Sequence, residues 1–318
     1  MSQPSRVSVV LPTFRRPAFL ARAIASVQLQ TLTDWELLVI DDNDADTDDR
    51  LATERTMERY AGEPRIRYVR HARNSGGAAA RNTGICSARA PWIAFLDDDD
   101  EWHPGKLARQ LAALRASEDT VALVYCRVLQ RHTATGAERP WRTDGRSHTA
   151  RDLLIRNNIG TTSCVMCRAD ALREVGMFDE TLRSRQDVDL YIRLADRYPF
   201  AFVDATLVTM NLHGHGRITT DVDATVDAHQ RFYQKYRERI DGDPEVKAAR
   251  LEAVGLVLLD GGRRLEARAY LQSAWRLHPT NRYVLQRLLL TYEPLSSLAR
   301  LVRRWRSRRS TSEDAANG

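Results

Sequence analysis

Four consecutive carboxylates, Asp97, Asp98, Asp99 and Asp100, come one residue after the apolar run 92–95, with Leu96 between them. Such a short run is typical of a strand buried in a parallel sheet, and the carboxyl end of that strand faces the ligand crevice. Crowded like charges repel one another, so a cation should offset them, and oxygen ligands favour Mg²⁺ or Mn²⁺. A solvated acidic turn is the alternative, but the preceding strand and the following Trp102 and Pro104 favour a metal site.

Polar residues follow two other expected strands as well. Pro12 to Arg16 comes after the run 7–11, and Asp42 comes after the run 35–40. A carboxylate at the second position suits the N–H of a uracil or thymine ring, or a ribose hydroxyl. Gly76 begins a helix that contains Arg81, and small residues there let a phosphate approach backbone N–H groups, although a Gly-Gly pair is more often a simple cap.

Strands and helices alternate over the first 120 residues, which is the pattern of a parallel sheet with right-handed crossovers. The expected strands are 7–11, 35–40, 66–69 and 92–95, and the expected helices are 17–30, 46–60, 76–88 and 106–117. The later pattern predicts strands over 121–130, 163–168 and 200–212, a helix over 187–196 and a polar loop over 131–147. The predicted class is therefore α/β, with a mostly parallel mixed sheet flanked by helices.

From residue 221 onward the chain is expected to be almost entirely helical. Five residues fall at the offsets of a single tetratricopeptide-like hairpin: Gly255, Ala267, Leu271, Ala274 and Pro279. One such repeat cannot bury its apolar face alone, so we expect it to pack on the first domain or on a partner. The expected domains are 1–220, a helical extension over 221–310 and a disordered tail over 311–318.

Arginines surround an apolar stripe near the C-terminus, between Leu295 and Arg309. The stripe consists of Leu295, Leu298, Leu301, Val302 and Trp305. This pattern predicts either a helix lying on an anionic membrane or a terminal helix that docks by its apolar side. Aromatic residues are too few among the arginines to favour nucleic-acid binding.

The composition is that of an ordinary globular protein, with 43% hydrophobic residues, 28% charged residues and a net charge of +6. The positive charge permits anionic partners such as nucleotides without choosing among them. Cys164 and Cys167 would point to opposite faces of a strand, so we expect this pair to be ordinary buried thiols rather than a metal or redox site, in keeping with a reducing compartment. A signal peptide and an apolar stretch of about 18 residues are both lacking, which favours a cytoplasmic protein; peripheral attachment to the inner face of the membrane through the basic C-terminal segment is the alternative that stays open.

Several motifs, taken together, resemble those of the family 2 inverting glycosyltransferases, which have the GT-A fold. The likeness is carried by residues 7–16, 36–42, 73–74, 80–84 and 95–102, and it runs in register from about Val7 to Thr220. It implies a nucleotide-sugar donor such as a UDP-sugar, a divalent metal, and a glycan or lipid-linked acceptor.

The resemblance also implies roles for individual residues. Asp97 to Asp99 would form the Asp-x-Asp motif, with Asp99 as the direct metal ligand and Asp98 nearer the ribose or the donor sugar. Asp100 and Glu101 would instead start the turn and helix that follow. Thr13 and Asp42 would hold the nucleobase. The full set expected around the donor nucleotide is Pro12, Thr13, Arg16, Asp42, Gly76, Arg81, Asp97 and Asp98.

The general base implied by the resemblance is Asp187, which precedes a helix as the family's Glu-Asp pair does. Gln186 stands in place of the family's Glu and removes one charge beside the base. Asp187 as a helix N-cap is the alternative. Members of the family often supply a late histidine to the metal, and His213 fits better by position than its substitute His215.

Two other functions compete with a transferase. A scaffold without activity would bind a partner through its helical C-terminus, but the joint presence of Asp99, Asp187 and a histidine argues against it. A nucleotidyltransferase would need a Gly-rich, basic loop after the first strand, and the sequence there is Pro-Thr-Phe.

Overall fold

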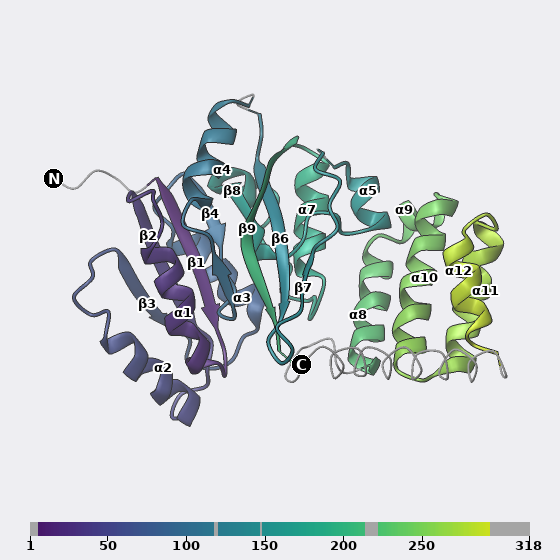
Figure 1. Cartoon of the computed structure of the whole chain (residues 1–318), viewed down its shortest axis with the longest axis horizontal. Helices are drawn as coiled ribbons and strands as arrows, with labels where there is room; N and C mark the ends of the chain where they lie inside the picture. Colours follow the sequence, from purple (N-terminus) through teal and green to yellow (C-terminus); the bar gives the residue numbers. More distant parts are fainter. Residues whose placement is uncertain (1–5, 118–119, 147, 214–221, 293–318) are drawn as a thin grey trace, which may run out of the picture. The chain divides into compact units, whose positions relative to one another are not determined.

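The computed structural model describes residues 6–117, 120–146, 148–213 and 222–292. The chain divides into two compact units, Met1–Arg217 and Ile218–Gly318 (Figure 1). The first unit is an α/β domain and the second is helical. The segment between Leu295 and Arg309, the tail 311–318 and His215 lie outside the described residues, so what was predicted for them stays a prediction.

One mixed sheet organises the first unit, with strands in the order β3-β2-β1-β4-β8-β6-β9-β5 and with β7 paired to β6. The strands are β1 (Val7–Thr13), β2 (Trp35–Asp41), β3 (Ile66–Arg70), β4 (Trp92–Phe95), β5 (Asp100–Trp102), β6 (Leu123–His132), β7 (Glu138–Pro140), β8 (Val165–Arg168) and β9 (Phe200–Leu212). Strands β1 to β4 run parallel, whereas β8 is antiparallel to β4 and β6. The predicted α/β class with a mixed sheet is confirmed.

Helices connect and cover these strands; five of them were predicted from the sequence, whereas the short α5 and α6 were not. They are α1 (Pro17–Gln28), α2 (Asp48–Glu58), α3 (Gly77–Ser87), α4 (Lys106–Arg115), α5 (Ala150–Ile155), α6 (Ala169–Glu174) and α7 (Gln186–Ala195), with a 3₁₀ turn η1 (Thr162–Cys164). Helix α1 begins at Pro17. Proline is tolerated there because the N–H that it lacks would have no intrahelical acceptor in the first turn. Helix α3 packs closely on β1, because a Cβ at Gly84 would lie 2.3 Å from Cγ1 of Val10.

Two local expectations are wrong. Asp100 and Glu101 do not start a turn and helix but form β5, because the long strand β9 offers an edge on which Asp100 pairs with Met210. The expected polar loop 131–147 contains β7, which folds back on β6 through a turn closed by Gly136 at φ 68°. The expectation for Cys164 and Cys167 is confirmed, since both are free and buried; Cys126 is free and buried as well, and Cys86 is free and exposed.

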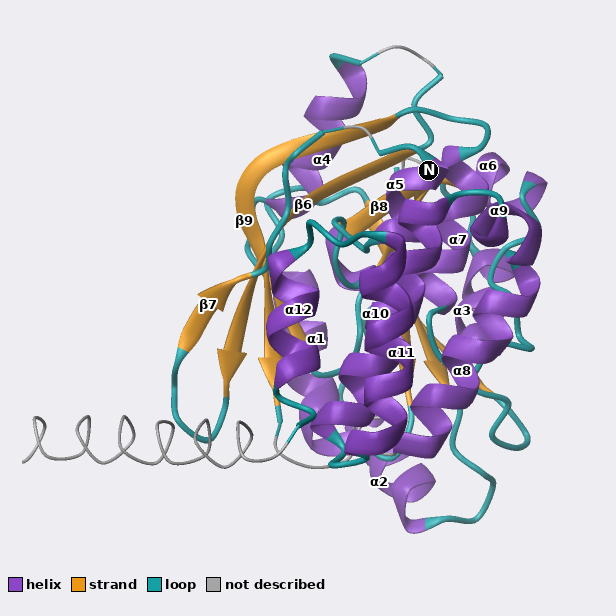
Figure 2. Cartoon of the chain, turned by 90° about the vertical axis from the view of Figure 1, so that its right-hand side faces the viewer, coloured by secondary structure: helices purple, strands orange, loops and turns teal. Residues whose placement is uncertain are grey.

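The second unit consists of α8 (Val222–Lys235), α9 (Arg237–Asp241), α10 (Pro244–Asp260), α11 (Arg264–Leu277) and α12 (Arg282–Leu289). Figures 1 and 2 both show α10 and α11 side by side. A Cβ at Gly255 would lie 2.8 Å from Cγ of Leu271, and Ala267 and Ala274 are fully buried. The predicted helical extension, with its tight hairpin, is confirmed. In the described part of the chain no helix combines the length and apolar character needed to span a bilayer.

Candidate active site

The carboxyl ends of β1, β2 and β4 meet at one edge of the sheet, since these strands run parallel. Pro12 and Thr13 close β1, and the Thr13 hydroxyl donates to Oδ2 of Asp98 at 2.8 Å. Nη1 of Arg16, which immediately precedes α1, lies 2.5 Å from Oδ2 of Asp99 and 3.5 Å from Oδ1 of Asp98. The structure thus brings the residues predicted after the first and fourth strands into direct contact.

Asp98 and Asp99 form an acidic pair that is mostly shielded from solvent, with side chains 7% and 15% exposed. Burial raises the pKa of Asp98 to about 7, repulsion from Asp99 adds to the shift, and Arg16 and the Thr13 hydroxyl oppose it. Burial likewise raises the pKa of Asp99, against the attraction of Arg16. Two such carboxylates make this position favourable for positive charge.

Asp97 belongs to a different set of contacts. Nη2 of Arg81, on α3, lies 2.6 Å from Oδ1 of Asp97. The Thr161 hydroxyl donates to Oδ2 of this carboxylate at 3.3 Å, and the Thr162 hydroxyl donates to Oδ1 at 3.1 Å. Burial alone would raise the pKa of Asp97, but Arg81 and the threonine hydroxyls outweigh it and hold that pKa below its usual value. The predicted Asp-x-Asp motif is therefore divided, with Asp97 turned to Arg81 and the other two carboxylates turned to Arg16.

Asp187 lies in the first turn of α7, close to Arg81. The N-cap of this helix is Arg185, held in the left-handed region at φ 62°, so the alternative of Asp187 as the N-cap is wrong. Arg81 donates to Oε1 of Gln186 at 3.5 Å, and Asn157 donates to Oδ2 of Asp187 at 3.4 Å. Burial raises the pKa of Asp187, while the Val188 N–H and the charges of both arginines counteract the shift.

His213 follows β9, and its positive charge is a small contribution that opposes the rise in the pKa of Asp99 caused by burial. Its ring stacks on Phe19 of α1 with centroids 4.3 Å apart, and Nδ1 lies 3.3 Å from the hydroxyl of Thr133. No group of three His, Cys, Asp or Glu side chains forms a ready metal cage within the described ranges. The donor set does fit Mg²⁺ or Mn²⁺, which bind proteins through one or two carboxylates and take further ligands from water and substrate phosphates.

Asp42 fixes the loop that precedes α3. Its Oδ1 lies 2.7 Å from Nδ1 of His71 and accepts from the Ser75 N–H, while its Oδ2 accepts from Asn74 Nδ2 and from the Gly76 N–H at 2.8 Å. Gly76 has φ 91°, which its lack of a Cβ permits. The expected contacts of Asp42 with a nucleobase and of Gly76 with a phosphate stay predictions. In each case the ligand would have to share the Asp42 carboxylate or the Gly76 N–H with the hydrogen bonds that these groups already form.

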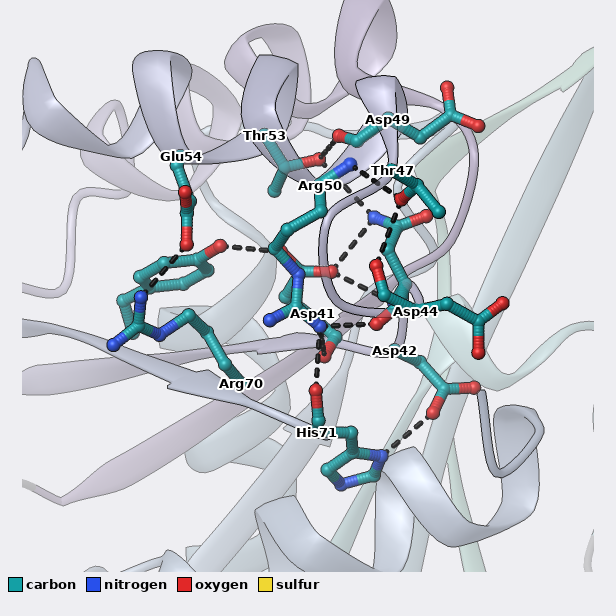
Figure 3. A network of polar contacts seen from close by, with 12 residues as sticks. Asp41, Asp42, Asp44, Thr47, Asp49, Arg50, Thr53, Glu54, Arg70 and His71 are labelled. Atoms are coloured by element: carbon teal, nitrogen blue, oxygen red, sulfur yellow. Dashed lines mark hydrogen bonds and ion pairs between the residues drawn. The ribbon is translucent and has the colours of Figure 1, made fainter. Parts of the chain in front are cut away.

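A buried network behind Asp42 holds the ends of β2 and β3 together, as Figure 3 shows. Nε of Arg50, on α2, lies 3.1 Å from Oδ2 of Asp41, and its Nη2 donates to the carbonyl oxygens of Asn43 and His71. Tyr68 donates to the same Asp41 carboxylate, and burial together with this bond raises the pKa of the tyrosine. The network fixes the backbone from which Asp42 and His71 extend.

Sequence reasoning missed the residues that shape the acidic turn from distant strands. The hydroxyl of Ser163 accepts from the Asp97 N–H at 3.0 Å, and its carbonyl accepts from Trp102 Nε1 at 2.9 Å. Asn211, near the end of β9, donates to the Asp99 carbonyl oxygen at 2.8 Å. These partners carry no motif, and only the order of strands in the sheet brings them to the site.

Several known proteins resemble this chain, some in sequence and some in fold. AmsB of Erwinia amylovora, an amylovoran biosynthesis glycosyltransferase, is 31% identical over 212 residues, which cover 65% of this chain and 69% of AmsB. Chondroitin synthase of Escherichia coli is 25% identical over 248 residues, covering 74% of this chain and 33% of that protein. The crystal structure of S. aureus TarS 1-349 in complex with UDP-GlcNAc matches 90% of this chain and 79% of its own, with a TM-score of 0.58 and 14% identity.

The family model described as glycosyl transferase family 2 matches residues 8–176, which is more than half of the chain. The matched stretch contains Thr13, Asp42, Arg81 and the Asp97–Asp99 motif, and the mixed sheet is the GT-A-like fold expected for them. The chain therefore belongs to glycosyl transferase family 2.

Proposed function

We propose that this glycosyltransferase moves a hexosyl group from a nucleotide-sugar, such as a UDP-sugar, to a hydroxyl of a glycan or lipid-linked acceptor, with inversion at the anomeric carbon. The observation that carries the proposal is the position of Asp187 beside Arg81, which in turn pairs with Asp97. A candidate base and the candidate donor motif thus border the same arginine. The names of AmsB and chondroitin synthase and the UDP-GlcNAc complex of TarS support the choice of substrates.

In this reaction Asp187 accepts the proton of the acceptor hydroxyl as that oxygen attacks the anomeric carbon. The new carbon–oxygen bond forms as the bond from the anomeric carbon to the diphosphate oxygen breaks, and the electron pair leaves with the nucleoside diphosphate. Attack from the face opposite the leaving group inverts the centre. The raised pKa of Asp187 makes it a stronger base than an exposed aspartate, which suits proton transfer near neutral pH.

Asp99 and His213 would hold the divalent metal, with Asp98 beside them. When bound there, Mg²⁺ or Mn²⁺ would supply positive charge to offset the charge that develops on the diphosphate. Arg81 orients the donor side, because it fixes Asp97 and reaches Gln186 next to the base. Gln186 keeps this contact without adding a negative charge beside Asp187.

The Asp187→Asn variant tests the proposal. We expect turnover to fall by roughly 10²- to 10⁴-fold, the contribution of a general base, while affinity for the donor stays within about twofold of the original. Transfer from UDP-GlcNAc and other UDP-, GDP- and dTDP-sugars is followed by chromatography, and product NMR reports the anomeric configuration. Turnover close to that of the unchanged protein, or a retained configuration, contradicts the assignment.

A further inference from the structure

Arg16 contacts both carboxylates at the position where the metal is expected. Its Nη1 lies 2.5 Å from Oδ2 of Asp99 and 3.5 Å from Oδ1 of Asp98. The guanidinium therefore faces the same oxygens that a divalent cation would use. Asp97 is excluded from this competition because it is paired with Arg81.

The backbone that carries Arg16 is fixed, but its side chain has access to solvent. The Arg15 N–H donates to Oδ1 of Asn43 at 2.8 Å, Arg15 has φ 56°, and α1 starts at Pro17. The Arg16 side chain is 31% exposed and does not cap α1. Rotation of this partly exposed side chain is therefore the movement that would release the carboxylates, while the start of α1 stays in place.

Charge explains why the guanidinium and a metal exclude one another here. One guanidinium neutralises half of the charge of an ionised Asp98–Asp99 pair, whereas a dication neutralises all of it. Both cannot bind the same oxygens, because they would stand at contact distance with like charge in a poorly solvated site. An arginine that is displaced from a carboxylate finds an equivalent planar partner in a phosphate group.

We propose that Arg16 is the resident counter-cation of the Asp98–Asp99 pair, that the divalent metal must displace it, and that the donor diphosphate receives the displaced guanidinium. This inference rests on the proposed metal site. It makes metal binding and nucleotide binding cooperative: the metal binds weakly to the protein alone, and more tightly once a diphosphate provides Arg16 with another partner.

Arg22 provides a matched control on the same helix. Its Nη2 donates to the backbone oxygen of Asp99 at 3.3 Å, and its Nε lies 3.4 Å from Oε1 of Glu101. Arg22→Gln therefore removes a positive charge from the neighbourhood of Asp99 without freeing an oxygen of the Asp98–Asp99 pair. Arg16→Gln removes the same charge and does free those oxygens.

The test is Mn²⁺ titration of the full chain, followed by the electron paramagnetic resonance of free Mn²⁺, with and without UDP. We expect Arg16→Gln to bind Mn²⁺ roughly tenfold more tightly than the unchanged protein when UDP is absent, and to lose most of the gain that UDP gives. Arg22→Gln should stay within about twofold of the unchanged protein.

Three results would overturn the proposal. Arg16→Gln could bind Mn²⁺ no more tightly than the unchanged protein, or Arg22→Gln could tighten binding equally, which would indicate a general charge effect. In the third result, neither the unchanged protein nor either variant binds Mn²⁺, with or without UDP, although the unchanged protein still transfers sugar. That last result removes the metal site and the exchange together but leaves the transferase function standing.

Discussion

Replacing Arg50 by methionine should destabilise the first unit far more than an exposed arginine would. The side chains of Arg50 and Asp41 are 7% and 0% exposed, and Nε lies 3.1 Å from Oδ2. Methionine fills much of the same volume but leaves the Asp41 carboxylate buried without its cation. It also removes donors from the carbonyl oxygens of Asn43 and His71 (Figure 3).

The expected loss follows from burial and distance. Two unit charges about 4 Å apart interact by about 4 kcal/mol at the effective dielectric constant of a protein, and breaking buried pairs costs about 3–5 kcal/mol. Two hydrogen bonds to carbonyl oxygens are lost as well, so we place the decrease in the free energy of unfolding at the upper part of that range. Because the carbonyl of His71 is released, the Km for the donor should rise too.

Native-state hydrogen exchange of the β2 amides measures the change, because the two units can unfold separately. Arg70→Met is the control: Arg70 Nη1 lies 2.8 Å from Glu54 Oε1, but these side chains are 58% and 30% exposed, so we expect only a small loss of stability, because solvent screens this pair. The double variant Arg50→Met/Asp41→Asn should recover part of the loss. The reasoning is refuted if Arg50→Met costs no more than Arg70→Met.

Three further predictions concern burial and close packing. Burial raises the pKa of Asp98 to about 7, so the native state binds a proton at this carboxyl more tightly than the unfolded chain does. The contribution of Asp98 to the free energy of unfolding therefore falls as the pH rises from about 4 to 7. In EDTA, Asp98→Asn should therefore gain on the order of 2 kcal/mol in unfolding free energy relative to the unchanged protein between about pH 5 and pH 8, and a constant difference would contradict this. Gly84→Ala should lower the free energy of urea unfolding by about 1–3 kcal/mol, because the added Cβ would lie 2.3 Å from Val10 Cγ1 on a buried strand; an unchanged midpoint would disprove it. Gly255→Ala should lower the free energy of unfolding of the second unit by less than Gly84→Ala lowers that of the first, since its Cβ would meet the Leu271 side chain at 2.8 Å and that side chain can move. A larger loss than at Gly84 would count against this comparison.

Strand ends were the part of the site that the sequence could predict. The run 92–95 matches β4 at both ends, and β1 and β2 extend only to Thr13 and Asp41 beyond the predicted 7–11 and 35–40. Apolar runs define buried strands, and parallel strands expose their carboxyl ends at one edge, so the meeting of Thr13 with Asp98 follows from pattern and topology alone. Strand β5 could not be predicted in this way, because it is short and polar and forms only where β9 supplies an edge.

The partners of the acidic run could not be predicted, because each comes from a distant part of the chain. Asp98 and Asp99 pair with Arg16, more than 80 residues earlier, whereas the backbone oxygen of Asp99 accepts from Asn211, 112 residues later. The run itself does not tell which partner each carboxylate has, and the fold does: Asp97 pairs with Arg81, whereas Asp98 and Asp99 face Arg16. The resemblance implied only that Arg16 lies near the donor nucleotide, and its position against Asp98 and Asp99 is what led us to propose that it exchanges with a metal.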